Sequence, residues 1–233
     1  MIFNKSKDFF LDLLFPRQCF SCHQEGQELC LNCLNGIELK APQCLICQKR
    51  SLNGKICDYC RTKTQLSRFF SVGSYDNELL RESIHLLKYS KVTDLSKILG
   101  ELAANYWRTY LNDIQRKLDV LIPIPLHSRR LRQRGFNQSE LIAKELNSAI
   151  GIPIETGALE RLKNTLPQVK IKNQEKREIN MRNAFLVKNK EAVREKTIIL
   201  FDDVATTGAT LDDAARALKE SGARSVWALV LAK

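Results

Sequence analysis

The chain has 233 residues, of which 44% are hydrophobic, so it can bury a core and divide into one small and one ordinary domain. Its apolar runs fall short of the ~20 residues that span a bilayer, so no membrane span is expected. The formal net charge is +11. It falls to about +7 if eight thiolates bind two zinc ions, and it still predicts an anionic partner: nucleic acid, a phosphorylated metabolite or a membrane surface.

Residues 1–18 are predicted to form a short amphipathic helix, with phenylalanine and leucine side chains on one side and Pro16 stopping it. Packing of this helix on the body of the chain is favoured over docking on a membrane. Asp8 and Asp12 interrupt its apolar positions, so a signal peptide is not expected and the predicted location is the cytoplasm.

All eight cysteines lie within one segment of the chain, in four CxxC pairs: Cys19 and Cys22, Cys30 and Cys33, Cys44 and Cys47, Cys57 and Cys60. A CxxC turn aims two sulfurs at one tetrahedral zinc ion. Gaps of seven and nine residues within the two halves favour two four-cysteine sites in sequence. Ligation of the first pair with the third, and of the second with the fourth, also fits the spacing. We predict a double zinc ribbon over residues 19–64, with two structural Zn²⁺ ions.

Zinc is favoured over three other uses of these cysteines. Disulfides suit an exported protein, a thioredoxin-like redox motif needs a single CxxC, and iron–sulfur motifs have other spacings. A zinc ribbon mostly holds a small domain together. Its basic side chains leave a contact with nucleic acid or protein open as well: Lys49, Arg50, Lys55, Arg61 and Lys63.

Strand-like and helix-like segments alternate beyond Phe69. Strands are predicted at 69–75, 119–123, 197–201 and 225–231, and helices at 77–88, 94–110, 138–149 and 210–220. This alternation predicts an α/β domain over residues 65–233, a parallel sheet with helices on both faces. The polar stretch 161–182 lacks periodicity over most of its length and is predicted to be a mobile loop.

A run of arginines directly follows the strand predicted at 119–123: Arg129, Arg130, Arg132 and Arg134. Arginine binds phosphate in a bidentate manner, so the run could neutralise a pyrophosphate. It could equally follow the phosphates of single-stranded DNA, with Phe136 stacking on a base and Lys88 and Tyr89 extending the surface. A solvated basic turn is the plain alternative.

The segment TIILFDDVATTGATL, residues 197–211, joins a buried strand to a helix through two carboxylates, Asp202 and Asp203, and a hydroxyl-rich loop. Backbone N–H groups and hydroxyls around a glycine at a helix N-terminus suit a phosphate. The predicted phosphate contacts are Thr206, Thr207, Gly208, Ala209 and Thr210. The carboxylates suit sugar hydroxyls or Mg²⁺. A phosphate beside a diol describes a ribose 5-phosphate, whereas a lone Thr/Gly loop would be an ordinary turn.

This segment resembles the phosphoribosyl pyrophosphate-binding motif of type I phosphoribosyltransferases: four apolar residues, two acids and a hydroxyl-rich loop around glycine. The similarity extends through LIPIPLHSRRLRQRGFNQSELIAKEL and RLKNTLPQVKIKNQEKREINMRNAF to the cysteine module. Nearly the whole chain thus resembles the ComF family of competence proteins, and RGFNQ is the most specific piece.

The resemblance implies a type I phosphoribosyltransferase fold and a role in natural transformation, where the protein would bind incoming single-stranded DNA on the cytoplasmic side. Asp202 and Asp203 would meet the ribose hydroxyls and residues 206–210 the 5-phosphate. Pro125 and His127 would belong to the pyrophosphate loop at 123–127. A flexible active-site loop at 165–180 would hold three further contacts: Gln168, Arg177 and Asn180.

Two functions remain open on the sequence. The first is a binding protein that handles single-stranded DNA, with phosphoribosyl pyrophosphate and Mg²⁺ as ligands, proteins of the DNA-uptake channel as partners, and a peripheral position at the inner membrane as one option. The second is an active phosphoribosyltransferase that acts on an acceptor such as a nucleobase. No Walker A motif occurs, so a DNA-translocating motor is not encoded in this sequence. The binding role is favoured because the resemblance is to a competence family.

Overall fold

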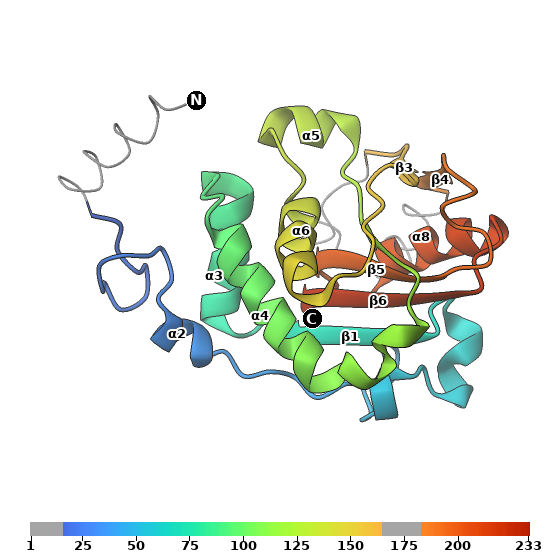
Figure 1. The fold of residues 1–233 in the computed structure, drawn as a ribbon, viewed down its shortest axis with the longest axis horizontal. Coiled ribbons are helices and arrows are strands. Elements are labelled where there is room, and N and C mark those ends of the chain that lie inside the picture. Colours follow the sequence, from blue (N-terminus) through green and yellow to red (C-terminus); the bar gives the residue numbers. More distant parts are fainter. Residues whose placement is uncertain (1–15, 165–182) are drawn as a thin grey trace.

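A computed structural model describes residues 16–164 and 183–233, and its centre is a parallel sheet (Figure 1). The strands lie in the order β1-β6-β5-β2. Their bounds are β1 Arg68–Gly73, β2 Val120–Pro123, β5 Thr197–Val204 and β6 Ser225–Ala232. Almost every position of β5 and β6 is buried, which explains why both strands are continuous apolar runs without alternation.

Helices cover both faces of this sheet, as predicted from the alternation of elements. The α-helices are α2 Leu31–Asn35, α3 Glu78–His85, α4 Leu95–Tyr110, α5 Ser128–Arg134, α6 Gln138–Ile150 and α8 Ala209–Glu220. The α3, α4 and α6 helices share one core cluster with one face of the sheet, and α8 shares a second cluster with the other. Short 3₁₀ helices lie at Leu52–Gly54, Asp58–Lys63 and Asn112–Lys117.

The structure departs from the sequence prediction in three places. The helix predicted at 77–88 ends at His85 and continues as a π-helical turn, Leu86–Ser90. The arginine run forms α5, which buries no side chain and therefore carries no apolar periodicity. The segment predicted as a loop from residue 161 begins within a strand, because β3 Leu159–Arg161 pairs antiparallel with β4 Phe185–Val187.

The cysteine module crosses the edge of the sheet at β1. The first cysteine cluster packs into the core under α3 and α4, and the second packs into the core beside α8. Between them, the Lys40 N–H donates to the Val72 carbonyl (2.9 Å), and Lys55 forms an antiparallel bridge with Arg68. The module thereby covers an edge strand that would otherwise expose unpaired backbone groups.

The helix predicted at the N-terminus falls mostly outside the described part of the chain. Residues 1–15 of the predicted helix at 1–18 lie outside the described residues. Within residues 16–164 and 183–233, no helix has the length and apolar character needed to cross a bilayer.

Candidate functional site

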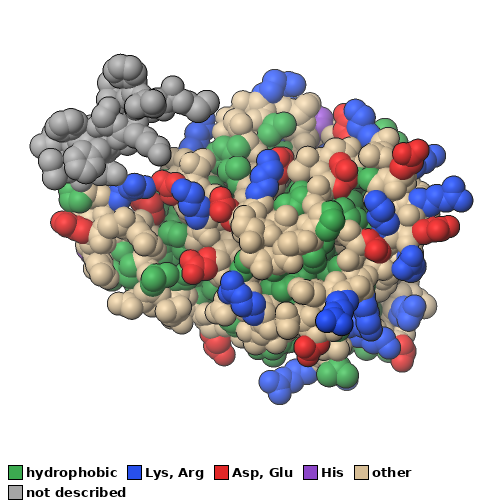
Figure 2. All heavy atoms as spheres, in the orientation of Figure 1, with side chains coloured by type: hydrophobic (Ala, Val, Ile, Leu, Met, Phe, Trp, Pro, Cys, Tyr) green, Lys and Arg blue, Asp and Glu red, His purple; other side chains and the backbone are tan. Residues whose placement is uncertain are grey.

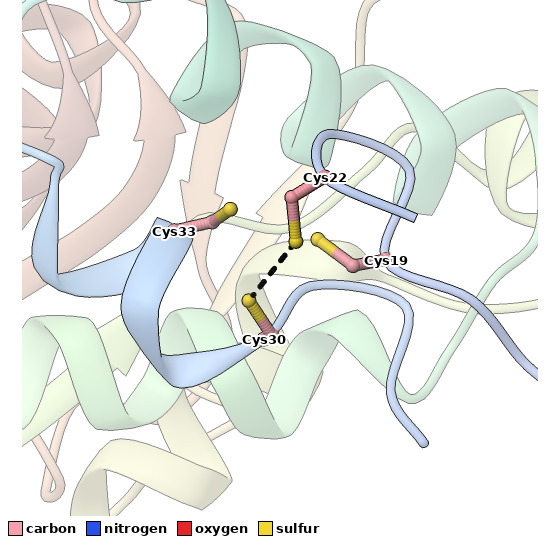
Figure 3. A group of neighbouring side chains, drawn as sticks. All are labelled: Cys19, Cys22, Cys30 and Cys33. Carbon is pink, nitrogen blue, oxygen red and sulfur yellow. Dashed lines mark hydrogen bonds between the residues drawn. The ribbon is translucent and has the colours of Figure 1, made fainter. Parts of the chain in front are cut away.

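The first cysteine cluster is arranged as a metal site (Figure 3). Cys19 and Cys22 lie on a turn, Cys30 is the residue that precedes α2, and Cys33 lies within α2. The four sulfurs point toward a common centre. The Sγ atoms of Cys22 and Cys30 are 3.5 Å apart. Zn–S bonds of about 2.3 Å in a tetrahedron place sulfurs roughly 3.8 Å apart, so this spacing fits zinc.

The second cluster repeats this arrangement with Cys44, Cys47, Cys57 and Cys60. In each cluster the ligand atoms lie within 4.8 Å of one another, and all eight cysteines are free of disulfides. The clusters are therefore sequential, and the interleaved ligation that the spacing allowed does not occur. Both clusters fit a structural Zn²⁺ ion.

Asp202 and Asp203 lie buried near the carboxyl end of β5, where the sequence places the sugar contacts. Lys88, in the π-helical turn, forms an ion pair with Asp203 (Nζ–Oδ2 2.7 Å). The Ser139 hydroxyl donates to Asp202 Oδ1 (2.8 Å). Burial, and then the charge of Asp203, raises the pKa of Asp202 to about 7, although Lys88 and the Ser139 hydrogen bond oppose this rise. The two carboxylates are thus held in fixed positions, and Lys88 offsets part of their negative charge.

The contacts of this carboxylate pair do not prepare a Mg²⁺ site. Mg²⁺ requires several open oxygens in octahedral geometry. Asp203 is instead paired with Lys88, and Asp202 accepts hydrogen bonds from Ser139 and from the Asp203 N–H. These two side chains therefore do not fit a Mg²⁺ ion in this arrangement.

The predicted phosphate loop follows β5 and enters α8. Gly208 takes φ +84°, a left-handed conformation that glycine adopts without strain, and it immediately precedes the helix. Thr206, Thr207 and Thr210 are half-buried around it. A side chain at Gly208 would come within 2.8 Å of Leu45 Cδ2, from the second zinc cluster's first CxxC turn. The zinc module is therefore packed directly against the phosphate loop.

The next turn of α8 fastens two other segments to this loop. Asp212 accepts hydrogen bonds from the Thr64 hydroxyl and the Gln65 N–H, both 2.7 Å, at the end of the zinc module. Asp213 is buried and accepts from the N–H groups of Asn183 (2.9 Å) and Ala184 (2.7 Å). The helix therefore anchors the zinc module on one side and the strand β4 on the other.

The RGFNQ stretch, residues 134–138, connects the loop after β2 with the start of α6. Gly135 ends α5 in the left-handed conformation, and the side chain of Asn137 caps α6 while donating to the Ile124 carbonyl (3.0 Å). Gln138 accepts from Arg134, and the following Ser139 reaches Asp202. This stretch therefore fixes the loop after β2 against the carboxyl end of β5.

The four arginines of α5 divide into two faces. Arg130 and Arg134 are one helical turn apart and half-buried, and Arg134 lies over the ring of Tyr89 (5.6 Å). Arg129 and Arg132 are exposed on the other side. Pro125 and His127 lead into the helix after β2, where His127 accepts the Arg129 N–H at Nδ1 (3.2 Å) and so caps it. Only two of the four arginines thus turn inward.

The structure changes the assignment of one of the two aromatic side chains predicted near the arginine run. Phe136, predicted as a base-stacking side chain, packs against the core beneath α6 and is only partly exposed. Tyr89 is 63% exposed and contacts both Arg134 and His85. Phe136 precedes the N-cap of a helix that docks on the sheet, so its ring is drawn into the core.

Arg161 is a site residue that the sequence did not indicate. It ends β3, with its guanidinium over the Phe185 ring (5.5 Å). Burial, and then the charge of Arg130, lowers its pKa, whereas Asp202 and Asp213 raise it. Arg161 therefore lies within electrostatic reach of both the carboxylates and the inward arginines. Only the pairing of β3 with β4 brings it there, so no local sequence pattern could have predicted it. The predicted loop contacts Gln168, Arg177 and Asn180 lie outside the described residues.

These elements define a class of protein: an α/β sheet with a phosphoribosyl-type strand, loop and helix, joined to a module with two four-cysteine clusters. Residues 88–233 match the phosphoribosyl transferase domain, and residues 10–61 match the double zinc ribbon domain. The match over residues 88–233 confirms the predicted type I phosphoribosyltransferase fold, and the match over residues 10–61 confirms the predicted zinc ribbon.

Relatives align over most of the chain. It is 30% identical to "Competence protein ComFC" of Bacillus subtilis, covering 84% of this chain and 80% of that one. It is 27% identical to "Competence protein F" of Haemophilus influenzae (87% and 96%) and 26% identical to "DNA utilization protein YhgH" of Salmonella typhimurium (93% and 98%). The chain therefore belongs to the ComF/YhgH family of competence and DNA utilization proteins.

Proposed function

We propose that this protein handles incoming single-stranded DNA on the cytoplasmic side during transformation, and that it binds phosphoribosyl pyrophosphate at the carboxyl ends of β2 and β5. The observation that carries the ligand assignment is the meeting of three groups at one end of the sheet. They are the two buried carboxylates of β5, the Gly208 loop at the start of α8, and the inward arginines of α5. A sugar phosphate with a diphosphate offers a partner to each group.

The charges at this end of the sheet suit a diphosphate. Burial, and then the neighbouring charge of Arg134, lowers the pKa of Arg130, so the two guanidiniums lie close enough to repel one another. Arg161, which is also half-buried, adds a third guanidinium within electrostatic reach of Arg130. A diphosphate would relieve this repulsion through charge-assisted hydrogen bonds. We therefore assign Arg130 and Arg134 to the pyrophosphate.

The DNA-handling part of the proposal draws on the family and on charge. The names of the relatives refer to competence and to DNA utilization. The excess of Lys and Arg over Asp and Glu gives this chain the charge that a phosphodiester strand requires. Catalytic phosphoribosyl transfer to a nucleobase is the second candidate, and the carboxylates and phosphate loop that favour it are the same groups that bind the ligand.

The two faces of α5 allow a direct test of the ligand site. We expect Arg130→Ala with Arg134→Ala to weaken phosphoribosyl pyrophosphate binding by roughly 100-fold or more, since two charge-assisted hydrogen bonds are each worth about 1.5–3 kcal/mol. Calorimetric titration of the zinc-loaded protein measures this change.

The control is Arg129→Ala with Arg132→Ala, which removes the same charge from the exposed side of the same helix. We expect a loss of about threefold or less from this pair, because exposed charges contribute little. Equal losses from the two pairs would show that the helix acts only through its total charge.

A further inference from the structure

A second basic feature lies at the opposite end of the sheet from the phosphoribosyl site. A groove of about 510 Å³ opens between the second zinc ribbon and the amino ends of the strands. Five cationic side chains line it: Lys55, Arg61, Arg68, Lys117 and Lys219. On the face shown in Figure 2, Lys and Arg side chains gather over the end of the molecule where this part of the zinc ribbon lies.

No carboxylate lines this groove in the part of the chain that the structure describes. Asp119, near Lys117 in the sequence, accepts the Thr197 N–H at 2.7 Å and is thereby held by the backbone of β5. Burial, and then the charge of Arg61, lowers the pKa of Lys219. The groove therefore concentrates positive charge without an internal counter-charge.

The walls of the groove are built rigidly. Arg68 lies over the indole of Trp227 (4.8 Å) and donates to the Asn53 carbonyl (2.6 Å). Lys219 donates to the Arg224 carbonyl (2.7 Å). Lys55, Arg61 and Lys117 are exposed at the rim. Two of the lining cations are thus held by contacts within the chain, and three exposed ones can follow a flexible strand.

The zinc ribbon also carries an exposed aromatic side chain that is close in sequence to the groove residues. Tyr59 is 82% exposed on the same 3₁₀ helix as Arg61, and Lys63 lies 5.1 Å from its ring centre. A cationic groove beside an exposed aromatic ring is the combination that binds single strands without sequence preference. A duplex is a rigid rod and suits a groove of this size less well than a flexible strand.

We propose that this groove holds the phosphodiester backbone of single-stranded nucleic acid, separately from the phosphoribosyl site. Along β5, Thr197 at the groove and Asp202 at the other site are five residues apart, or about 16 Å. This spacing places the two anionic ligands at opposite ends of the sheet, so both can be bound at once. The inference rests on the proposed DNA-handling function and specifies its site.

The test is a titration of labelled dT20 with the zinc-loaded protein at several salt concentrations. Three rim cations are replaced together: Lys55→Gln, Arg61→Gln and Lys117→Gln. Each phosphate contact on a single strand contributes about 0.7 to the slope of log affinity against log salt. We expect the triple variant to lower this slope by about 2 and to bind roughly 100-fold more weakly at 0.1 M salt.

The matched control removes the same charge from helices on the other face of the sheet, with Lys97→Gln, Arg108→Gln and Lys144→Gln. We expect its slope to equal that of the unaltered protein, and thermal melting verifies that both variants fold. An unchanged slope in the rim variant, or an equal loss in the control, would overturn the inference while leaving the proposed function standing. Failure of the unaltered protein to bind dT20 would overturn both.

Two further ligands separate a nucleic-acid groove from a pocket for single phosphates. We expect dT20 to bind far more tightly than dT4, because the longer strand makes every rim contact at once. Inorganic phosphate at the same phosphate concentration should compete poorly. Equal affinity for dT4 and dT20, or full competition by inorganic phosphate, would identify a small-anion pocket and contradict the proposal.

Discussion

Replacing Asp202 and Asp203 together by alanine is expected to abolish measurable binding of phosphoribosyl pyrophosphate while leaving the fold intact. Both carboxylates are buried at the carboxyl end of β5 and would accept the ribose hydroxyls. Losing two charge-assisted hydrogen bonds weakens a complex by about 3–6 kcal/mol, which is roughly 100-fold or more. Calorimetric titration against the unaltered protein gives the result.

A control separates this effect from a change in net charge. Asp76 and Asp113 are exposed and belong to segments other than β5, so Asp76→Ala with Asp113→Ala removes the same two charges. The control should bind the ligand as the unaltered protein does. Unchanged affinity in the Asp202 and Asp203 variant would show that these carboxylates do not bind the ribose hydroxyls.

The second large effect concerns zinc, because the two clusters lie against different parts of the fold. Cys57→Ser with Cys60→Ser should lose one of two zinc ions and also weaken the phosphoribosyl ligand. The reason is that Leu45, between two cysteines of the same cluster, packs against Gly208. Structural Zn²⁺ contributes about 10–16 kcal/mol in isolated zinc-finger peptides, so the neighbouring loop cannot keep its packing without the ion.

The matching variant in the first cluster is Cys30→Ser with Cys33→Ser. This cluster packs under α3 and α4, on the other face of the sheet from the Gly208 loop. We expect it to lose one zinc ion and to melt at a lower temperature, with ligand affinity close to that of the unaltered protein. Metal analysis and calorimetry on the two variants decide the matter. Equal losses of affinity would mean that zinc acts only through overall stability.

Much of the fold could be predicted because its signals are local. The CxxC spacing, the apolar run of β5 and the Thr/Gly loop each act within a few residues, and the structure places them as expected. The sequential pairing of the cysteines needed the structure, because the spacing allowed two arrangements. The sequence located the four-arginine run next to the strand β2, but it could not predict which arginines turn inward. The helix α5 has no buried side chain, so no apolar pattern marks its inner face.

The remaining site residues could not be predicted because tertiary packing brings them together. Lys88 reaches Asp203 only because the helix before it ends in a π-helical turn, and Arg161 arrives through the pairing of β3 with β4. Leu45 and Gly208 are far apart in the sequence, and only folding places the zinc module on the phosphate loop. The basic groove likewise gathers cations from four separate segments.

One molecule is proposed to bind single-stranded DNA and a phosphoribosyl ligand at opposite ends of its sheet. The most direct test is an anisotropy titration of labelled dT20 with zinc-loaded protein, with and without saturating phosphoribosyl pyrophosphate. Binding of dT20 in both conditions, with dissociation constants that agree within about twofold, is the predicted result. Displacement of dT20 by the ligand would contradict the two-site account and place the DNA at the arginines of α5.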